Sequence, residues 1–131
     1  MIEIIVNGFG KVAKPANFGV LLKDDDDQTH QRAVPLEIKS SYAAELLGIK
    51  YGMLTLKGRD HDILVKSSSP HITKSLAKKD DEWPSSRSKS IELLVEVRAL
   101  ADEFSSFECK LEQDSPDMDY VKELARKPIR S

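Results

Sequence analysis

The spacing of apolar residues changes along this chain, and that change limits the fold more than any other feature. In the N-terminal third, apolar side chains recur at every second position, as Ile2, Ile4 and Val6 do, which is typical of strands. Beyond it, stretches with a period of three to four alternate with short apolar runs. The predicted order is strand, strand, strand, helix, strand, helix, helix, strand, helix. This order indicates a mixed α/β sheet with the first three strands antiparallel and helices over its faces.

The boundaries of these elements follow from turn and cap residues. The expected strands are 2–7, 18–23, 34–38, 63–66 and 107–111, and the expected helices are 40–57, a short one from 70, 91–104, and one from 115 or 116 to 126. The helix over 40–57 carries a stripe of apolar residues: Tyr42, Leu46, Ile49, Met53 and Leu56. Pro35 cannot donate a ladder hydrogen bond on its ring side, so the third strand is expected at a sheet edge. Asp24–Asp27 is interpreted as a solvated hairpin tip, because the spaced ligands and glycine of a calcium loop are absent.

Length and composition favour one domain over residues 1–131. A chain of 131 residues with 40% hydrophobic content can bury one core, and its net charge of −2 provides no global basic field. The single cysteine, Cys109, cannot form an internal disulfide and is expected to face the core, where it would not serve as a nucleophile. Neither a cleavable signal nor an apolar run long enough for a membrane helix is evident, so we expect a soluble cytoplasmic protein without membrane contact.

Three separated segments of the chain resemble segments of type 1 ribonucleases H. They are Ile2–Val20, Ser40–Leu56 and Ile63–Leu76. In that family the first strand ends in Asp-Gly, a Pro-Ala-x-x-Gly-Val segment opens the second strand, a helix carries an inward Glu, and the fourth strand ends in Asp-Ser. The matching residues here are Asn7-Gly8, Pro15–Val20, Glu45 and Ser68-Ser69. The resemblance depends on their order and spacing, spans nearly the whole chain, and implies a ribonuclease H-like mixed sheet of five strands flanked by helices.

The resemblance also implies metal-dependent cleavage of RNA, and two of the matching residues, Asn7 and Ser68, are poor metal ligands. Ribonucleases H cleave the RNA strand of an RNA/DNA hybrid with two Mg²⁺ or Mn²⁺ ions held by clustered carboxylates. At the four catalytic positions this chain has Asn7, Glu45, Ser68 and Asp119, of which Asn7, Glu45 and Asp119 are the expected metal ligands. Asn7 and Ser68 carry no charge, so the site loses charge as well as geometry. We expect Asn7, Glu45 and Ser68 to meet at one end of the sheet.

Each of these four positions has an alternative. Asn7 can simply end a strand, and Glu45 lies at the margin of its helical stripe, where the side chain can bend toward water. A shift of the alignment by one residue replaces Ser68 with Ser67, and Ser68 or Ser69 can serve as the cap of the helix that begins at Pro70. The last acidic position is Asp119 in one register and Lys122 in another, and the second register removes the acid.

A local group of basic residues follows the fourth strand. It consists of Lys74, Lys78, Lys79, Arg87 and Lys89, with Trp83 among them as a residue able to stack on a base. In the resembled family this region helps to hold the hybrid. The acidic residues of 80–82 cancel much of the charge, so an ordinary solvated segment is the alternative.

Three classes of function remain open. The first is a ribonuclease H-like protein that binds RNA or an RNA/DNA hybrid with impaired or absent catalysis, and we favour it. The second is an active Mg²⁺-dependent or Mn²⁺-dependent ribonuclease H, and the third is a protein-interaction module on the same scaffold, because a fold does not determine a function. The sequence identifies no protein partner.

Overall fold

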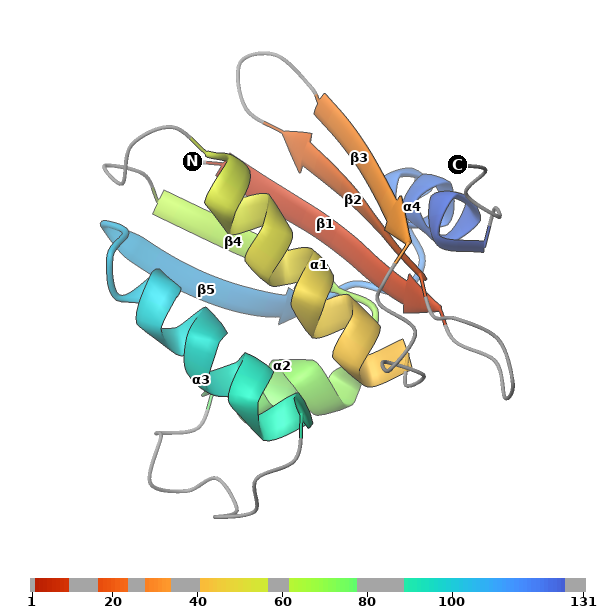
Figure 1. The fold of residues 1–131 in the computed structure, drawn as a ribbon. Helices are drawn as coiled ribbons and strands as arrows, with labels where there is room; N and C mark the ends of the chain where they lie inside the picture. Colours follow the sequence, from red (N-terminus) through yellow and green to blue (C-terminus); the bar gives the residue numbers. More distant parts are fainter. Residues whose placement is uncertain are drawn as a thin grey trace.

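The structure is a computed structural model, and it describes residues 2–9, 17–23, 28–33, 41–56, 62–77 and 89–126. One sheet forms the centre of the molecule, with helices on both faces (Figure 1). Among the described residues, no helix has the length and apolar character needed to cross a membrane.

The sheet is mixed, as the sequence predicted. Its strands are β1 (Ile2–Phe9), β2 (Asn17–Lys23), β3 (Gln28–Ala33), β4 (Asp62–Ser67) and β5 (Ser106–Leu111), in the spatial order β3-β2-β1-β4-β5. The pairs β1–β2 and β2–β3 are antiparallel, whereas β1–β4 and β4–β5 are parallel. Because β1 and β4 pair in parallel, the C-terminal ends of these two strands lie side by side at the same end of the sheet.

Helices cover the two faces unequally. Helix α1 (Ser41–Thr55), α2 (Pro70–Ala77) and α3 (Lys89–Ala101) lie on one face, and α4 (Pro116–Arg126) lies on the other (Figure 1). Alternation along β1 explains this division: Ile4 and Val6 join the large core under α1, whereas Ile5 packs with residues of α4. Strand residues that bury apolar side chains on both faces are typical of the centre of such a sheet.

The expected stripe on α1 forms its buried face. Four of its members are buried, namely Leu46, Ile49, Met53 and Leu56, and Tyr42 is partly buried against them. Burying a side chain of this size contributes roughly 1.5–3 kcal/mol. These contacts fix the rotation of α1 about its axis, and therefore the direction in which its other side chains point.

The third strand begins earlier than the sequence predicted. It is β3, which pairs with β2 from Leu22↔Gln28 to Asn17↔Ala33 and has no partner on its other side within the sheet. The predicted range 34–38 lies outside the described residues. The error has a physical reason: residues of β3 are almost all polar, so the strand carries no hydrophobic period, and its pairing with β2 after a short connection determines its position instead.

Candidate functional site

Asn7 and Ser68 meet because their strands run parallel. Val6 lies opposite Ser67 in the parallel register of β1 and β4. Asn7 follows Val6, and Ser68 follows Ser67. The Ser68 Oγ lies 2.7 Å from Asn7 Oδ1. Two residues 61 positions apart in the chain therefore form one polar contact at the end of the sheet, as the sequence led us to expect.

Glu45 joins them from α1 and points inward. The residue is only 2% exposed, so its side chain does not bend out to water. Its Oε1 lies 2.6 Å from Ser68 Oγ and accepts a longer bond of 3.3 Å from the Gly8 backbone N–H, while its Oε2 accepts a bond of 2.7 Å from Ser67 Oγ. We call Asn7, Glu45, Ser67 and Ser68 the Glu45 cluster.

Burial dominates the acidity of Glu45. It raises the pKa of this carboxyl above the ordinary value, and the hydrogen bonds from Ser68, Ser67 and Gly8 oppose that change without cancelling it. The Ser68 hydroxyl has one proton but lies close to two oxygens, Glu45 Oε1 and Asn7 Oδ1. Both contacts become hydrogen bonds when protonated Glu45 donates to Ser68 and Ser68 donates to Asn7. With ionised Glu45, the same contacts require the Asn7 amide to turn its NH₂ toward Ser68.

A pocket open to solvent lies directly over this cluster. Its volume is about 290 Å³, and it is lined by Gly8, Tyr42, Glu45, Ser68, Ser69, Pro70 and His71. Tyr42 is held in place by a hydrogen bond of 3.1 Å from its hydroxyl to Ser75 Oγ, and His71 is exposed at the start of α2. A ligand in this pocket can reach the Ser68 hydroxyl and the Glu45 carboxyl together.

The three consecutive serines have different roles. Ser69 caps α2, because its Oγ accepts from the Ile72 N–H at 3.4 Å, so the cap does not require Ser68. Ser67 is fully buried and bonds to Glu45 from the inward side of β4, and sequence reasoning had considered it only as an alternative in alignment. Ser67 continues the every-second-residue series of Ile63 and Val65, and this alternation in the sequence is the signal that could have identified it as inward-facing.

The last acidic position has two candidates, Asp119 and Lys122. Asp119 is exposed on α4, and among the described residues no hydrogen bond or ion pair joins it to the Glu45 cluster. At about 100° per residue, Met118, Val121 and Ala125 form the face of α4 that packs on the sheet, Lys122 lies at the edge of that face, and Asp119 points away from it. Lys122 Nζ donates to the Gln113 carbonyl at 2.9 Å, and Gln113 Nε2 donates to the Ser68 carbonyl at 3.2 Å. This arrangement favours the register in which Lys122 takes the last position.

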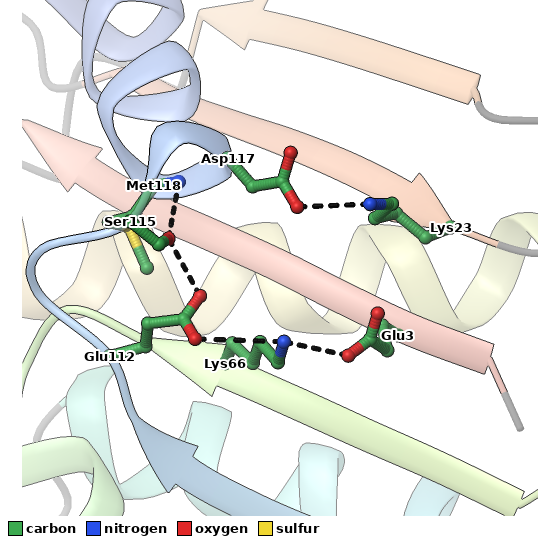
Figure 2. A network of polar contacts seen from close by, with 7 residues as sticks. All are labelled: Glu3, Lys23, Lys66, Glu112, Ser115, Asp117 and Met118. Carbon is green, nitrogen blue, oxygen red and sulfur yellow. Dashed lines mark hydrogen bonds and ion pairs between the residues drawn. The ribbon is translucent and has the colours of Figure 1, made fainter.

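Ionic contacts fix the connection between β5 and α4 next to this site (Figure 2). Lys66 Nζ lies 2.7 Å from Glu3 and 3.6 Å from Glu112, and the other oxygen of Glu112 accepts from Ser115 Oγ at 2.8 Å. Ser115 Oγ in turn accepts from the Met118 N–H at 3.0 Å and caps α4. The two carboxylates raise the pKa of Lys66, with the hydrogen bond to Glu3 as the largest cause.

Two further contacts hold the same region. Glu112 N–H donates to the Ser67 carbonyl at 2.9 Å, which extends the link from β4 into the β5–α4 connection. At the same N-terminal end of α4, Lys23 of β2 forms an ion pair of 3.0 Å with Asp117 (Figure 2). The start of α4 is therefore held by contacts to the end of β4 and to β2.

The predicted basic group is described only in part. Lys74 is exposed on α2, and Lys89 is the first residue of α3. Lys78, Lys79, Trp83 and Arg87 lie outside the described residues. Cys109 packs against the large core as expected, and burial raises the pKa of its thiol to about 12, which keeps it protonated and unreactive.

Comparisons with known proteins agree with this architecture. No protein-family model matches the sequence, and no curated protein matches it either. Among solved structures, the chain is similar to the N-terminal ribonuclease H domain of a Mycobacterium tuberculosis protein, solved as a fusion with maltose-binding protein. The TM-score is 0.72 at 16% identity, over 94% of this chain and 95% of that chain.

Two other solved structures extend the likeness. Ribonuclease H1 of the halophilic archaeon Halobacterium salinarum gives a TM-score of 0.72 at 16% identity, over 95% of this chain and 93% of that one. A ribonuclease H1 designated LC11, solved in complex with an RNA/DNA hybrid, gives 0.65 at 15% identity over 95% and 93% of the two chains. With the strand order and the helices on both faces, these likenesses establish that this chain has the ribonuclease H-like fold.

Proposed function

We propose that this protein binds nucleic acid, with an RNA/DNA hybrid or RNA as the ligand, and has lost metal-dependent cleavage. The observation that carries the proposal is the composition of the Glu45 cluster. Its residues stand where the resemblance to ribonucleases H expects catalytic carboxylates, yet Glu45 is its single carboxyl group, and the groups beside it are an amide and two hydroxyls.

The donor set does not suit a pair of divalent ions. Mg²⁺ and Mn²⁺ prefer several charged oxygen ligands, and two ions at close distance need carboxylates that bridge them. Asn7 and Ser68 are neutral, and burial raises the pKa of Glu45, which further reduces negative charge. Among the described residues, no group of three or more His, Cys, Asp or Glu side chains could hold a metal ion. Mg²⁺ or Mn²⁺ would be the cofactor only of an active enzyme, which this chemistry disfavours.

Two observations support a nucleic-acid ligand over a purely structural role. A pocket open to solvent is lined by Glu45 and Ser68, two members of the Glu45 cluster, so a ligand can approach them. The similar LC11 structure was solved with an RNA/DNA hybrid bound, so a protein of this fold can hold such a duplex. Lys74, together with Lys78, Lys79, Trp83, Arg87 and Lys89, would contact the backbone of that duplex through charge and stacking.

The experiment combines binding and cleavage on one set of substrates. Fluorescence anisotropy would be measured with an RNA/DNA hybrid, single-stranded RNA and duplex DNA of matched sequence, and the same samples would be run on a denaturing gel with Mg²⁺ or Mn²⁺. We expect binding to the hybrid or RNA that weakens with added salt, and intact RNA on the gel. Absence of binding to all three ligands at low salt would contradict the proposal and favour the protein-interaction module. Cleavage that Glu45→Gln abolishes would favour the active enzyme.

A further inference from the structure

Lys122 is linked to Ser68, at the end of β4, through a single residue, Gln113. Its Nζ donates to the Gln113 carbonyl at 2.9 Å, and the amide of that same glutamine donates to the Ser68 carbonyl at 3.2 Å. Gln113 therefore spans the distance between the ammonium and the end of β4. The contact between Lys122 and Gln113 lies at the surface, so a ligand that enters from solvent can reach the ammonium.

The packing of α4 positions Lys122 from the direction of Asn7 as well. Asn7 lies opposite Gly19 in the register of β1 and β2. A Cβ added at Gly19 would lie 2.7 Å from the Val121 carbonyl oxygen and 3.1 Å from the Ala125 backbone nitrogen. The helical turn that contains Lys122 thus lies directly on the strand beside Asn7. The two observations are independent: the first links the ammonium to the end of β4 through Gln113, and the second packs the backbone of the turn that contains Lys122 against the strand beside Asn7.

In the part of the chain that the structure describes, no carboxylate pairs with Lys122. Its hydrogen-bond acceptor is a neutral carbonyl, and among the described residues it forms no ion pair. Other lysines near α4 are different, because Lys23 is paired with Asp117 and Lys66 with Glu3 and Glu112. A fixed, partly exposed ammonium without a carboxylate partner is available for an anionic ligand.

The groups around this point complement phosphate better than metal. An ammonium, an amide and a hydroxyl are the side-chain donors that bind phosphate oxygens, whereas a metal ion would be repelled by the ammonium and weakly held by the amide. We propose that Lys122, with the Asn7 amide, binds a phosphodiester oxygen of the nucleic acid directly, so that a resident ammonium replaces the metal ions of the fold. This inference rests on the proposed function and specifies how the site holds its ligand.

The test is hybrid binding by the full chain in the presence of EDTA, measured by anisotropy over a range of salt concentrations. Lys122→Met should weaken binding about tenfold and lower the slope of log Kd against log salt by about one, because one phosphate contact is lost. Lys122→Arg should retain most of the affinity. The matched control is Lys110→Met, which removes the same charge from an exposed position on β5 and should change the affinity by less than about twofold.

A second measurement does not depend on substitution. In a two-dimensional NMR titration of the unaltered protein with the hybrid in EDTA, the side-chain NH₂ signals of Asn7 should shift. Equal effects of Lys122→Met and Lys110→Met, unmoved Asn7 signals, or binding that requires Mg²⁺ would each overturn the inference while leaving nucleic-acid binding itself intact. A failure of the unaltered protein to bind any nucleic acid would overturn the proposed function as well, so the two failures are distinguishable.

Discussion

The hydroxyl of Ser68 lies 2.6 Å from the carboxyl of Glu45, although the two residues belong to different elements and are 23 positions apart. In a two-metal nuclease these positions would hold two carboxylates that repel one another until metal ions bind. Here they form a hydrogen bond that satisfies both groups without any ion. The site is therefore organised in the absence of metal, and the following predictions depend on that property.

Replacement of Glu45 by Gln should stabilise the protein at neutral pH. The folded-state pKa of Glu45 is raised above the ordinary value of 4.5. The contribution of this carboxyl to the free energy of unfolding is therefore complete below about pH 4.5, where it is protonated, and is lost as the pH rises through the folded-state pKa. Each unit of difference corresponds to about 1.4 kcal/mol. Gln remains neutral, so Glu45→Gln should raise the free energy of unfolding at about pH 8, and the gain should shrink toward about pH 4.5.

Urea unfolding at several pH values measures this difference. The other titratable groups that face Glu45 are Cys109, which stays protonated over this range, and Tyr42 and His71 at the pocket. Glu108→Gln, at an exposed position on β5, is the control and should show no such pH dependence. Parallel stability curves for the unaltered protein and Glu45→Gln would show that the carboxyl does not titrate differently in the folded state.

Replacement of Ser67 by Ala should destabilise the fold more than a surface serine does. Ser67 is fully buried, donates to Glu45 Oε2 at 2.7 Å and accepts from the Ser69 N–H at 3.1 Å. Loss of its hydroxyl leaves a buried carboxyl oxygen without a donor, at a cost of roughly 1–3 kcal/mol. Ser105→Ala, at an exposed position, should change stability by less than about 0.5 kcal/mol. Equal urea midpoints for the two variants would contradict a role for Ser67 in holding Glu45.

Replacement of Gly19 by Ala should loosen α4. The added Cβ would lie 2.7 Å from the backbone oxygen of Val121, and a backbone atom cannot rotate away as a side chain can. We expect a loss of roughly 1–3 kcal/mol in chemical denaturation, with α4 displaced from the sheet. Gly52→Ala is the matched control, because its nearest contact is Ile4 Cγ2, a side-chain carbon at 3.2 Å rather than a backbone atom at 2.7 Å, and alanine favours the helix. A larger loss for Gly52→Ala would argue against close packing of α4 at Gly19.

Much of the fold could be predicted from the sequence, because apolar periods set the positions of the buried elements. The stripe on α1 and the alternation in β1 both depend on burial, and the structure agrees with them. β3 was placed incorrectly because it is an edge strand with polar residues, and its position depends on pairing with β2. Hydrophobic pattern contains no information on such a strand.

The site was predictable to a smaller extent. The order of the segments brought Asn7, Glu45 and Ser68 to the same end of the sheet, since parallel neighbours share that end. It could not decide between Asp119 and Lys122, because two registers of the alignment place one or the other there and the choice depends on which face of α4 meets the sheet. Nor could it distinguish Ser67, Ser68 and Ser69, whose roles differ only in the direction of each side chain at the end of β4.

Restoration of a metal site should require a change at Lys122. The double variant Asn7→Asp, Ser68→Asp supplies two carboxylates, and helix α2 should tolerate it because Ser69 provides the cap. An ammonium beside the new carboxylates would still repel a cation, so Mn²⁺ binding by calorimetry should become clearly stronger only when Lys122→Asp is added. The control combines the double variant with Lys110→Asp. Equal Mn²⁺ affinity in the two triple variants would show that Lys122 has no influence on the site.

The most direct test asks whether the RNA strand of an RNA/DNA hybrid stays intact while the protein is bound to it. Saturating protein would be incubated with a labelled RNA/DNA hybrid in EDTA, Mg²⁺ or Mn²⁺, with binding followed by anisotropy and the RNA by denaturing gel, alongside Glu45→Gln. The account predicts the same binding in all three conditions and RNA that stays intact, because the Glu45 cluster lacks the charged ligands from which metal ions supply most of the catalysis. Cleavage in Mg²⁺ or Mn²⁺ that disappears in EDTA and in Glu45→Gln would contradict it.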